Sequence, residues 1–340
     1  MNYNNNFNFL RIFAAVLVGV THSYAITGHA ASEPLHQLTN GFFYLSSIGL
    51  YIFFFTSGYL VSRSAATSKS SLIFLQKRIL RIYPALIVVV LLSVFIAGPL
   101  LTSLSSRQYF ADMDTWKYLW TATGLKIMFR LPGVFEQPGF AMAGFNGSLW
   151  SIKLELELYG LLFILMFVGI FKKRGLLLII LITSAVACLL MSVMDWPSTV
   201  ITGQKNMLLA CAFLFGGIMQ TKTISKKHAV YLFMGSGLLL LVKLTGMLPV
   251  NPGLDEVIFF SLATYFIAFT RWFTIHLKHD ISYGVYIYTF PLQQLVFQLS
   301  GFNQPTFVNL LLSLSCSGIL AFLSWIYIEK PALQYKSRLS

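Results

Sequence analysis

Arg11 and His22 are the residues of the first apolar stretch whose types and spacing could support chemistry. They are eleven residues apart, and a helix with about 100° per residue would place both side chains on one face. Along the helix axis they would be roughly 16 Å apart, about half the thickness of a bilayer's hydrocarbon core. Because ionisable groups are costly at that depth, the pattern predicts a functional cavity. The alternative is that Arg11 reaches lipid phosphates and His22 hydrogen-bonds a neighbouring helix.

A second polar group is formed by Lys153, Glu155 and Glu157, which occur together in another apolar stretch. Lys153 and Glu157 are four residues apart and are predicted to pair on one helix face. Glu155 points to a different face, and Arg11 or His22 is its predicted partner. A carboxylate bonded to an imidazole fixes its tautomer and raises its basicity, so that the histidine can act as a general base. A structural ion pair at Glu155 is the alternative.

Arg78 and Arg81 are i,i+3 neighbours just before an apolar span, so both project from one helix face. Two adjacent guanidinium groups suit phosphate or pyrophosphate, which they bind in a bidentate manner. Attraction to anionic lipid is the alternative. Ser57 and Gly58, late in the second span, would let another backbone or a ligand approach closely, although helix packing alone explains such a pair and is the favoured interpretation. Ser282 is predicted to cap the helix of the ninth span.

The elements that must position these residues are membrane spans. The chain has 340 residues, of which 56% are apolar and only 10% charged, against about 25% charged residues in a soluble domain. This composition predicts an all-α polytopic membrane protein, and the net charge of +13 is then better explained by cytoplasmic loops than by nucleic acid. The three cysteines fall in apolar runs and predict neither disulfides nor a metal site. We expect about ten spans, at residues 8–27, 41–61, 82–103, 147–170, 175–194, 206–220, 229–248, 257–271, 281–300 and 306–328.

The basic residues predict the orientation of these spans. Most of the 24 lysines and arginines fall in loops on one side if the N-terminus is cytoplasmic, so both termini are predicted to be cytoplasmic. The one long connection, 104–146, is then an outer-face loop that is predicted to lie over the mouth of a cavity and to be re-entrant. Nothing indicates a second domain, so residues 1–340 are predicted to form a single transmembrane domain.

Taken in order, these stretches resemble the integral-membrane acyltransferase family 3. The resemblance covers nearly the whole chain, and each motif alone is weak while the ordered set is specific. Its residues are Arg11 with His22; Ser57 within Phe53–Leu60; Arg78 and Arg81 before Tyr83-Pro84; Trp150 and Ser151 leading to Glu155 and Tyr159; Ser282-Tyr283 with Tyr286 and Pro291; and Glu329-Lys330-Pro331.

The resemblance implies an acetyl-CoA-dependent O-acetyltransferase in a bacterial inner membrane. The acetyl group would pass from cytoplasmic acetyl-CoA to a hydroxyl of a surface or exported glycan, such as exopolysaccharide, O-antigen or capsule. The partners implied are the bilayer, the glycan acceptor and glycan-assembly proteins, with no nucleic acid and no metal.

The resemblance also implies a role for each site residue. Arg78, Arg81 and Arg63 would hold the phosphates of CoA, and Arg11 would line the route inward. His22, oriented by Glu155, would act as general base on the acceptor hydroxyl or would take the acyl group covalently, and the sequence leaves both open. Donors such as Trp150 or Tyr286 would stabilise the oxyanion. The remaining cavity residues implied are Ser57, Tyr83, Ser151, Tyr159 and Tyr283.

The sequence departs from the family pattern at two informative positions. Tyr51 stands where the family often has an aspartate, and Thr289 where it often has a histidine. Two other functions stay open. A proton-coupled transporter or glycan exporter would use His22 and Glu155 as a relay, although no inverted repeat is evident. A non-catalytic scaffold would give the paired arginines and Glu155 no purpose.

Overall fold

The computed structural model describes residues 5–136, 139–142, 144–193, 198–221, 224–247, 253–270, 274–275 and 277–338. Within these ranges every regular element is a helix and no strand occurs, which confirms the all-α fold class. The helices are α1 (Phe7–Ile26), α2 (Pro34–Leu38), α3 (Leu45–Thr67), α4 (Ser71–Leu92), α5 (Gly98–Leu101), α6 (Ser106–Ala111), α7 (Met113–Lys117), α8 (Trp150–Phe167), α9 (Arg174–Val193), α10 (Ser198–Gln220), α11 (Lys226–Leu244), α12 (Leu254–Ala268), α13 (Ser282–Leu299), α14 (Thr306–Ser324) and α15 (Lys330–Arg338).

Short helical segments join these elements. The 3-10 turns are η1 (Ala30–Ser32), η3 (Tyr118–Thr123), η4 (Gly147–Leu149) and η5 (Ile170–Lys172), and the π-helical turns are η2 (Ser93–Ala97) and η6 (Trp325–Glu329). Because the π-helical turns do not break the chain's helical path, α4 continues into α5 and α14 into α15. The last helix therefore continues past residue 328, where the sequence predicted its end.

The helices confirm a polytopic membrane protein. Each of the ten predicted spans contains a helix. Five helices of the described residues are long and apolar enough to cross a membrane unaided: Phe7–Ile26, Leu45–Thr67, Ser71–Leu101, Lys226–Leu244 and Thr306–Tyr335. The helical stretches Gly175–Ala187 and Lys205–Gln220 are apolar but shorter.

The third span was predicted to begin at residue 82, which is eleven residues later than the start of its helix at Ser71. Its helix starts at Ser71, where Ser70 Oγ accepts a hydrogen bond of 3.2 Å from the backbone N–H of Ile73, and not near residue 82. The helix is apolar at its first turn, but Lys77, Arg78 and Arg81 interrupt the apolar run because they line a cavity, and a count of apolar residues therefore started the span after them. Arg78 and Arg81 are therefore well inside a regular helix.

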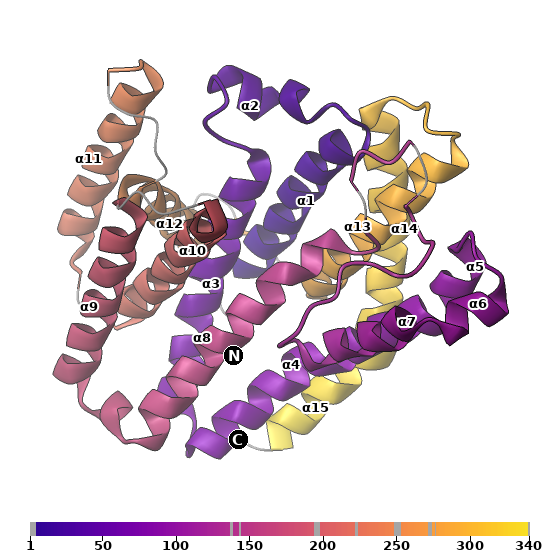
Figure 1. The fold of residues 1–340 in the computed structure, drawn as a ribbon. Helices are drawn as coiled ribbons and strands as arrows, with labels where there is room; N and C mark the ends of the chain where they lie inside the picture. The colour runs from indigo at the N-terminus through magenta and orange to yellow at the C-terminus, as the bar shows by residue number, and fades with distance from the viewer. Residues whose placement is uncertain are drawn as a thin grey trace.

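Helices α1 and α3 run antiparallel through the middle of the bundle, with α9 to α12 on one side and α13 and α14 on the other (Figure 1). The packing of α3 depends on small residues: a Cβ at Gly49 would lie 2.7 Å from the carbonyl oxygen of Ala14 in α1. A Cβ at Gly58 would collide with the backbone of Phe213 in α10, which confirms a close backbone approach at Gly58. At the start of α1, the ring of Phe7 contacts the ring of Tyr59 in α3, with 5.2 Å between ring centroids.

The connection between α5 and α8 folds back against the bundle. Tyr83 Oη, in the middle of α4, donates to the carbonyl oxygen of Thr123 over 2.9 Å. Asn146 Nδ2 donates to the carbonyl oxygen of Ile287 in α13 over 2.8 Å. Helix α8 consequently begins inside the bundle, beside α13, and its exposed Lys153 and Glu157 pair at 3.9 Å as predicted. The division into one domain and the membrane sidedness of 104–146 stay predictions.

Candidate active site

A cavity of about 680 Å³ opens between α1, α3, α4, α8 and the start of α13. Most of the predicted charged site residues meet there, although they come from four separate helices, α1, α3, α4 and α8. The predicted residues that line the cavity are Arg11, Ser57, Arg63, Arg78, Arg81, Glu155, Tyr159 and Tyr283. Lys77, Ser64, Asp280 and Trp325 join them, although the sequence analysis assigned them no role.

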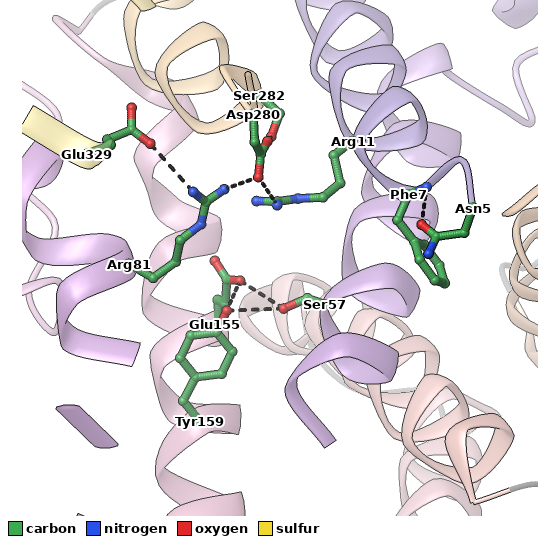
Figure 2. A network of polar contacts seen from close by, with 10 residues as sticks. All are labelled: Asn5, Phe7, Arg11, Ser57, Arg81, Glu155, Tyr159, Asp280, Ser282 and Glu329. Carbon is green, nitrogen blue, oxygen red and sulfur yellow. Dashed lines mark hydrogen bonds and ion pairs between the residues drawn. The ribbon is translucent and has the colours of Figure 1, made fainter. Parts of the chain in front are cut away.

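Asp280 connects two arginines across one wall of the cavity. Arg11 Nη1 and Arg81 Nη2 lie 2.5 Å and 2.7 Å from the same atom, Asp280 Oδ2, and Figure 2 shows both guanidinium groups converging on it. Ser282 Oγ donates to Asp280 Oδ1 over 2.6 Å, so Ser282 does not form the predicted helix cap. Glu329 lies on the other side of Arg81, at 3.7 Å.

The carboxyl of Asp280 is ionised because of these neighbours. Burial acts to raise its pKa, but the charges of Arg11 and Arg81 and the hydrogen bonds from Ser282 outweigh burial and hold the pKa well below its usual range. The folded-state pKa is lowered, so the contribution of this carboxylate to stability is present above the ordinary aspartate pKa and is lost only as the pH falls through the lowered value. The Arg11–Asp280–Arg81 bridge therefore persists at any physiological pH.

Glu155 lies on another wall of the cavity and is 6% exposed. Ser57 Oγ donates to Glu155 Oε1 over 2.9 Å, and Tyr159, one helical turn along α8, donates to the same oxygen (Figure 2). The hydroxyls of Ser57 and Tyr159 also lie 3.2 Å apart. These contacts correct the prediction that Glu155 pairs with Arg11 or His22, since its hydrogen-bond partners in the described structure are two hydroxyl groups.

Arg78 packs by its flat face, since its guanidinium carbon lies 5.6 Å from the ring centroid of Tyr159 and 5.7 Å from that of Phe74. Its Nη2 donates to Ser64 Oγ over 3.2 Å. The Nε–H of this 8% exposed side chain has no acceptor among the residues described here. A buried guanidinium with an unused donor beside a cavity fits an anionic ligand.

His22 lies outside this cavity. It is the sixteenth of the twenty residues of α1, eleven residues beyond the cavity-lining Arg11, which corresponds to roughly 16 Å along the helix axis. Its ring meets Phe290 edge to face, with 5.0 Å between centroids, and the ring makes no hydrogen bond to a residue that the structure describes. The predicted His22–Glu155 contact is wrong because α8 begins deep in the bundle and places Glu155 level with the start of α1 rather than with its far end.

The other predicted cavity residues hold the surrounding helices together. Tyr286 Oη donates to the carbonyl oxygen of Ser148 over 2.7 Å and lies 2.7 Å from Ser151 Oγ. Tyr286 is thus engaged with backbone and hydroxyl rather than open as an oxyanion donor. Tyr283 Oη donates to the carbonyl oxygen of Ile82 over 3.2 Å. Tyr83 and Trp150 do not line the cavity described above.

Two positions that depart from the family pattern are filled by other polar contacts. Tyr51 donates to Glu256 Oε2 in α12 over 3.1 Å, so a carboxylate is present near this position from another helix. Thr289 Oγ1 donates to Ser317 Oγ in α14 over 2.9 Å. Both are buried inter-helix hydrogen bonds.

Sequence reasoning missed Lys77, Asp280 and Glu329. Lys77 adjoins Arg78 in the sequence, and its residue type alone gave no reason to separate it from the other lysines. Asp280 precedes the Ser282-Tyr283 motif by two residues, and an acidic residue directly before an apolar span was the available signal. Glu329 belongs to a motif that received no chemical role, and only the tertiary structure brings it to Arg81.

The chain is similar to known proteins over most of its length. A family model described as an acyltransferase domain, that of the acyltransferase family 3, matches residues 4–330. The chain is 30% identical to an O-acetyl transferase of Shigella phage Sf6 over 359 aligned positions, which cover 99% of this chain and 98% of the phage protein. It is 31% identical to nodulation protein 10 of Rhizobium leguminosarum bv. viciae over 167 positions, 46% of this chain and 42% of that protein. No solved structure matches.

Proposed function

The chain belongs to the integral-membrane acyltransferase family 3, and we propose that it transfers an acetyl group from acetyl-CoA to a hydroxyl of a glycan. The family makes it a multi-pass membrane acyltransferase. The phage relative, by its name an O-acetyl transferase, supports acetyl as the group transferred. The observation that carries the choice of donor is the cationic cavity.

The cavity residues fit a donor that bears phosphates. Five cationic side chains, those of Arg11, Arg63, Lys77, Arg78 and Arg81, line it, against the carboxylates of Glu155 and Asp280. Guanidinium groups bind phosphates in a bidentate manner, and Arg78 retains an unused donor at Nε. Arg78 and Arg81, with Arg63 and Lys77, would hold the phosphates of acetyl-CoA, and Glu155 would shape the wall through Ser57 and Tyr159.

His22 is the proposed catalytic group. Coenzyme A separates its thioester from its phosphates by the flexible pantetheine arm, which suits a histidine roughly 16 Å farther along α1 than Arg11. As general base, His22 takes the proton of the acceptor hydroxyl while the acceptor oxygen bonds to the acetyl carbonyl carbon. The C–S bond then breaks, and the departing thiolate of CoA receives that proton. The acyl-histidine relay is the second route for the same residue.

The acceptor is proposed to be a surface or exported glycan at the outer face of a bacterial inner membrane. The segment 104–146 would lie at that face, where it would meet the acceptor and glycan-assembly proteins. This segment accepts a hydrogen bond from Tyr83 in α4 and donates one to Ile287 in α13, and both helices also contribute residues to the donor cavity.

The test uses purified full-length protein in detergent with labelled acetyl-CoA and a hydroxyl-rich polysaccharide. We expect label on the polysaccharide, one free CoA per transfer, and competition by free CoA. Arg78→Gln should weaken the donor interaction, whereas Lys117→Gln, which changes an exposed lysine paired with Asp114, should not. Turnover without any ion gradient excludes the transporter alternative. Failure of the wild-type protein to bind or consume acetyl-CoA would reject the proposal.

A further inference from the structure

Asp280 has no role in the proposed chemistry, yet its carboxylate lies between Arg11 and Arg81, two of the cations that line the donor cavity. It precedes α13 by two residues, while Arg11 belongs to α1 and Arg81 to α4. One carboxylate oxygen receives a nitrogen from each arginine, so both nitrogens lie within 2.7 Å of a single atom. The three side chains are each 12% to 15% exposed and line the donor cavity together.

The carboxylate is fixed on its side away from the arginines. Ser282 Oγ donates to Oδ1 over 2.6 Å, and Ser282 is itself 2% exposed at the first position of α13. Asp280 is therefore attached to a helix end rather than to a flexible surface loop. On the far side of Arg81, Glu329 at 3.7 Å adds a second carboxylate that limits the rotation of this guanidinium.

Two guanidinium groups so close together repel each other, and a shared carboxylate is what makes their approach favourable. A neutral side chain at position 280 would leave Arg11 and Arg81 to separate or to turn toward water. The cavity still contains more cations than carboxylates, so the bridge orders the two arginines without neutralising the site.

We propose that Asp280 is a positioning residue for the acyl donor: it sets the spacing and direction of Arg11 and Arg81 so that one anionic group of the donor meets both. The inference rests on the proposed function, because it takes the phosphate-bearing donor as the ligand of the cavity. Asp280 acts through the arginines and does not touch the donor. The donor therefore binds a pair that is already aligned, and less of its binding free energy is spent on ordering side chains.

The experiment compares wild-type protein with Asp280→Asn, which keeps the shape and removes the charge. With labelled acetyl-CoA, we expect the KM and the equilibrium dissociation constant for the donor to rise about tenfold. A change of this size corresponds to the loss of roughly one charge-assisted hydrogen bond. The kcat at saturating donor should stay within about twofold of wild type, because the reacting atoms are unaffected. Asp280→Glu should restore part of the affinity. Asp114→Asn, at an exposed aspartate paired with Lys117, is the matched control and should leave donor affinity unchanged.

Ser282→Ala is a second variant for the case that Asp280→Asn does not fold. It removes the hydrogen bond that Ser282 donates to Asp280 and keeps the carboxylate itself. A smaller rise of donor KM in the same direction is expected. Unchanged donor affinity in both Asp280→Asn and Ser282→Ala, or a fall of kcat with KM intact, would overturn the positioning role. Tighter donor binding in Asp280→Asn would overturn it too, since the carboxylate would then compete with the donor. If the wild-type protein itself does not bind acetyl-CoA, the proposed function fails, and this inference fails with it.

Discussion

The two ends of α1 lie in opposite surroundings. Near its start, Arg11 faces a cavity of ion pairs and guanidinium groups. Near its end, His22 contacts the ring of Phe290, and the next residue, Ser23, accepts a hydrogen bond of 2.7 Å from the amide of Gln293. The first region gathers several guanidinium groups and carboxylates, whereas the second holds one buried carboxylate, Glu33, which accepts a hydrogen bond of 2.6 Å from Thr21. The molecule thus separates the groups suited to bind an anion from the group suited to move a proton.

The separation has a chemical use in an acyltransferase. Guanidinium groups bind phosphates best when they are ordered and partly removed from water, as the bridge from Asp280 to Arg11 and Arg81 provides. A general base works only while its imidazole is unprotonated, and His22 lies apart from the arginine cavity with its ring against Phe290. We predicted that His22 and Glu155 pair in one site, whereas the structure places Arg11 in the cavity and His22, the proposed base, outside it on the same helix.

The largest effect should come from His22→Ala. We expect transfer to fall by about 10²- to 10⁴-fold, the usual worth of a positioned acid–base group, with donor affinity unchanged. Transfer is followed as label on the acceptor, and affinity as equilibrium binding of labelled acetyl-CoA. His29→Ala, at an exposed histidine beyond the end of α1, is the control and should keep full activity. Transfer by His22→Ala at the wild-type rate would show that His22 is not the catalytic base.

Arg78→Lys should have the next largest effect. Lysine keeps the charge but loses the flat face that packs on Tyr159 and Phe74, and it cannot hold a phosphate with two parallel bonds. We expect the KM for acetyl-CoA to rise about tenfold with kcat nearly constant. Arg107→Lys, at an exposed arginine, should change neither constant. An equal fall of kcat would mean that the charged site takes part in the chemical step.

Glu155→Gln sharpens the comparison through pH. Because Glu155 is bonded to Ser57 and Tyr159 and not to His22, the substitution should weaken donor binding a few-fold and leave the pH dependence of kcat unshifted. The measurement is a pH–rate profile at saturating donor, with Glu157→Gln on the exposed face of α8 as control. A displaced acid limb in Glu155→Gln would show that the carboxylate communicates with His22 after all.

Tyr286→Phe should have the smallest effect. It removes the hydrogen bonds that join α13 to the carbonyl oxygen of Ser148 and to Ser151. We expect a loss of about 1 kcal/mol in the free energy of unfolding, since inter-helix hydrogen bonds in membrane proteins are modest. Thermal unfolding in detergent measures it, and donor affinity should be retained. A loss of transfer far beyond the loss of stability would indicate a catalytic hydroxyl.

The helices of the fold could be predicted from the sequence because membrane spans are long apolar runs. All ten predicted spans contain helices, and the family resemblance is confirmed over nearly the whole chain. The start of α4 was placed too late, since a count of apolar residues is interrupted by Lys77, Arg78 and Arg81, which line the cavity. The pairing of Lys153 with Glu157 was found because it depends only on spacing within one helix.

The arrangement of the arginines could also be predicted from spacing within one helix, whereas the partners of Glu155 and Arg11 on other helices could not. Residue type and helical spacing by themselves determined that Arg78 and Arg81 share a face and that Arg11 and His22 lie about three turns apart. Which residues meet across helices depends on the depth at which each helix starts, and α8 starts inside the bundle. Only the tertiary structure decided that Glu155 meets Ser57 and that Asp280 joins Arg11 to Arg81, because these contacts link residues 98 to 269 positions apart. Tyr159, by contrast, is four residues from Glu155 on the same helix, so helical spacing alone could have predicted that contact.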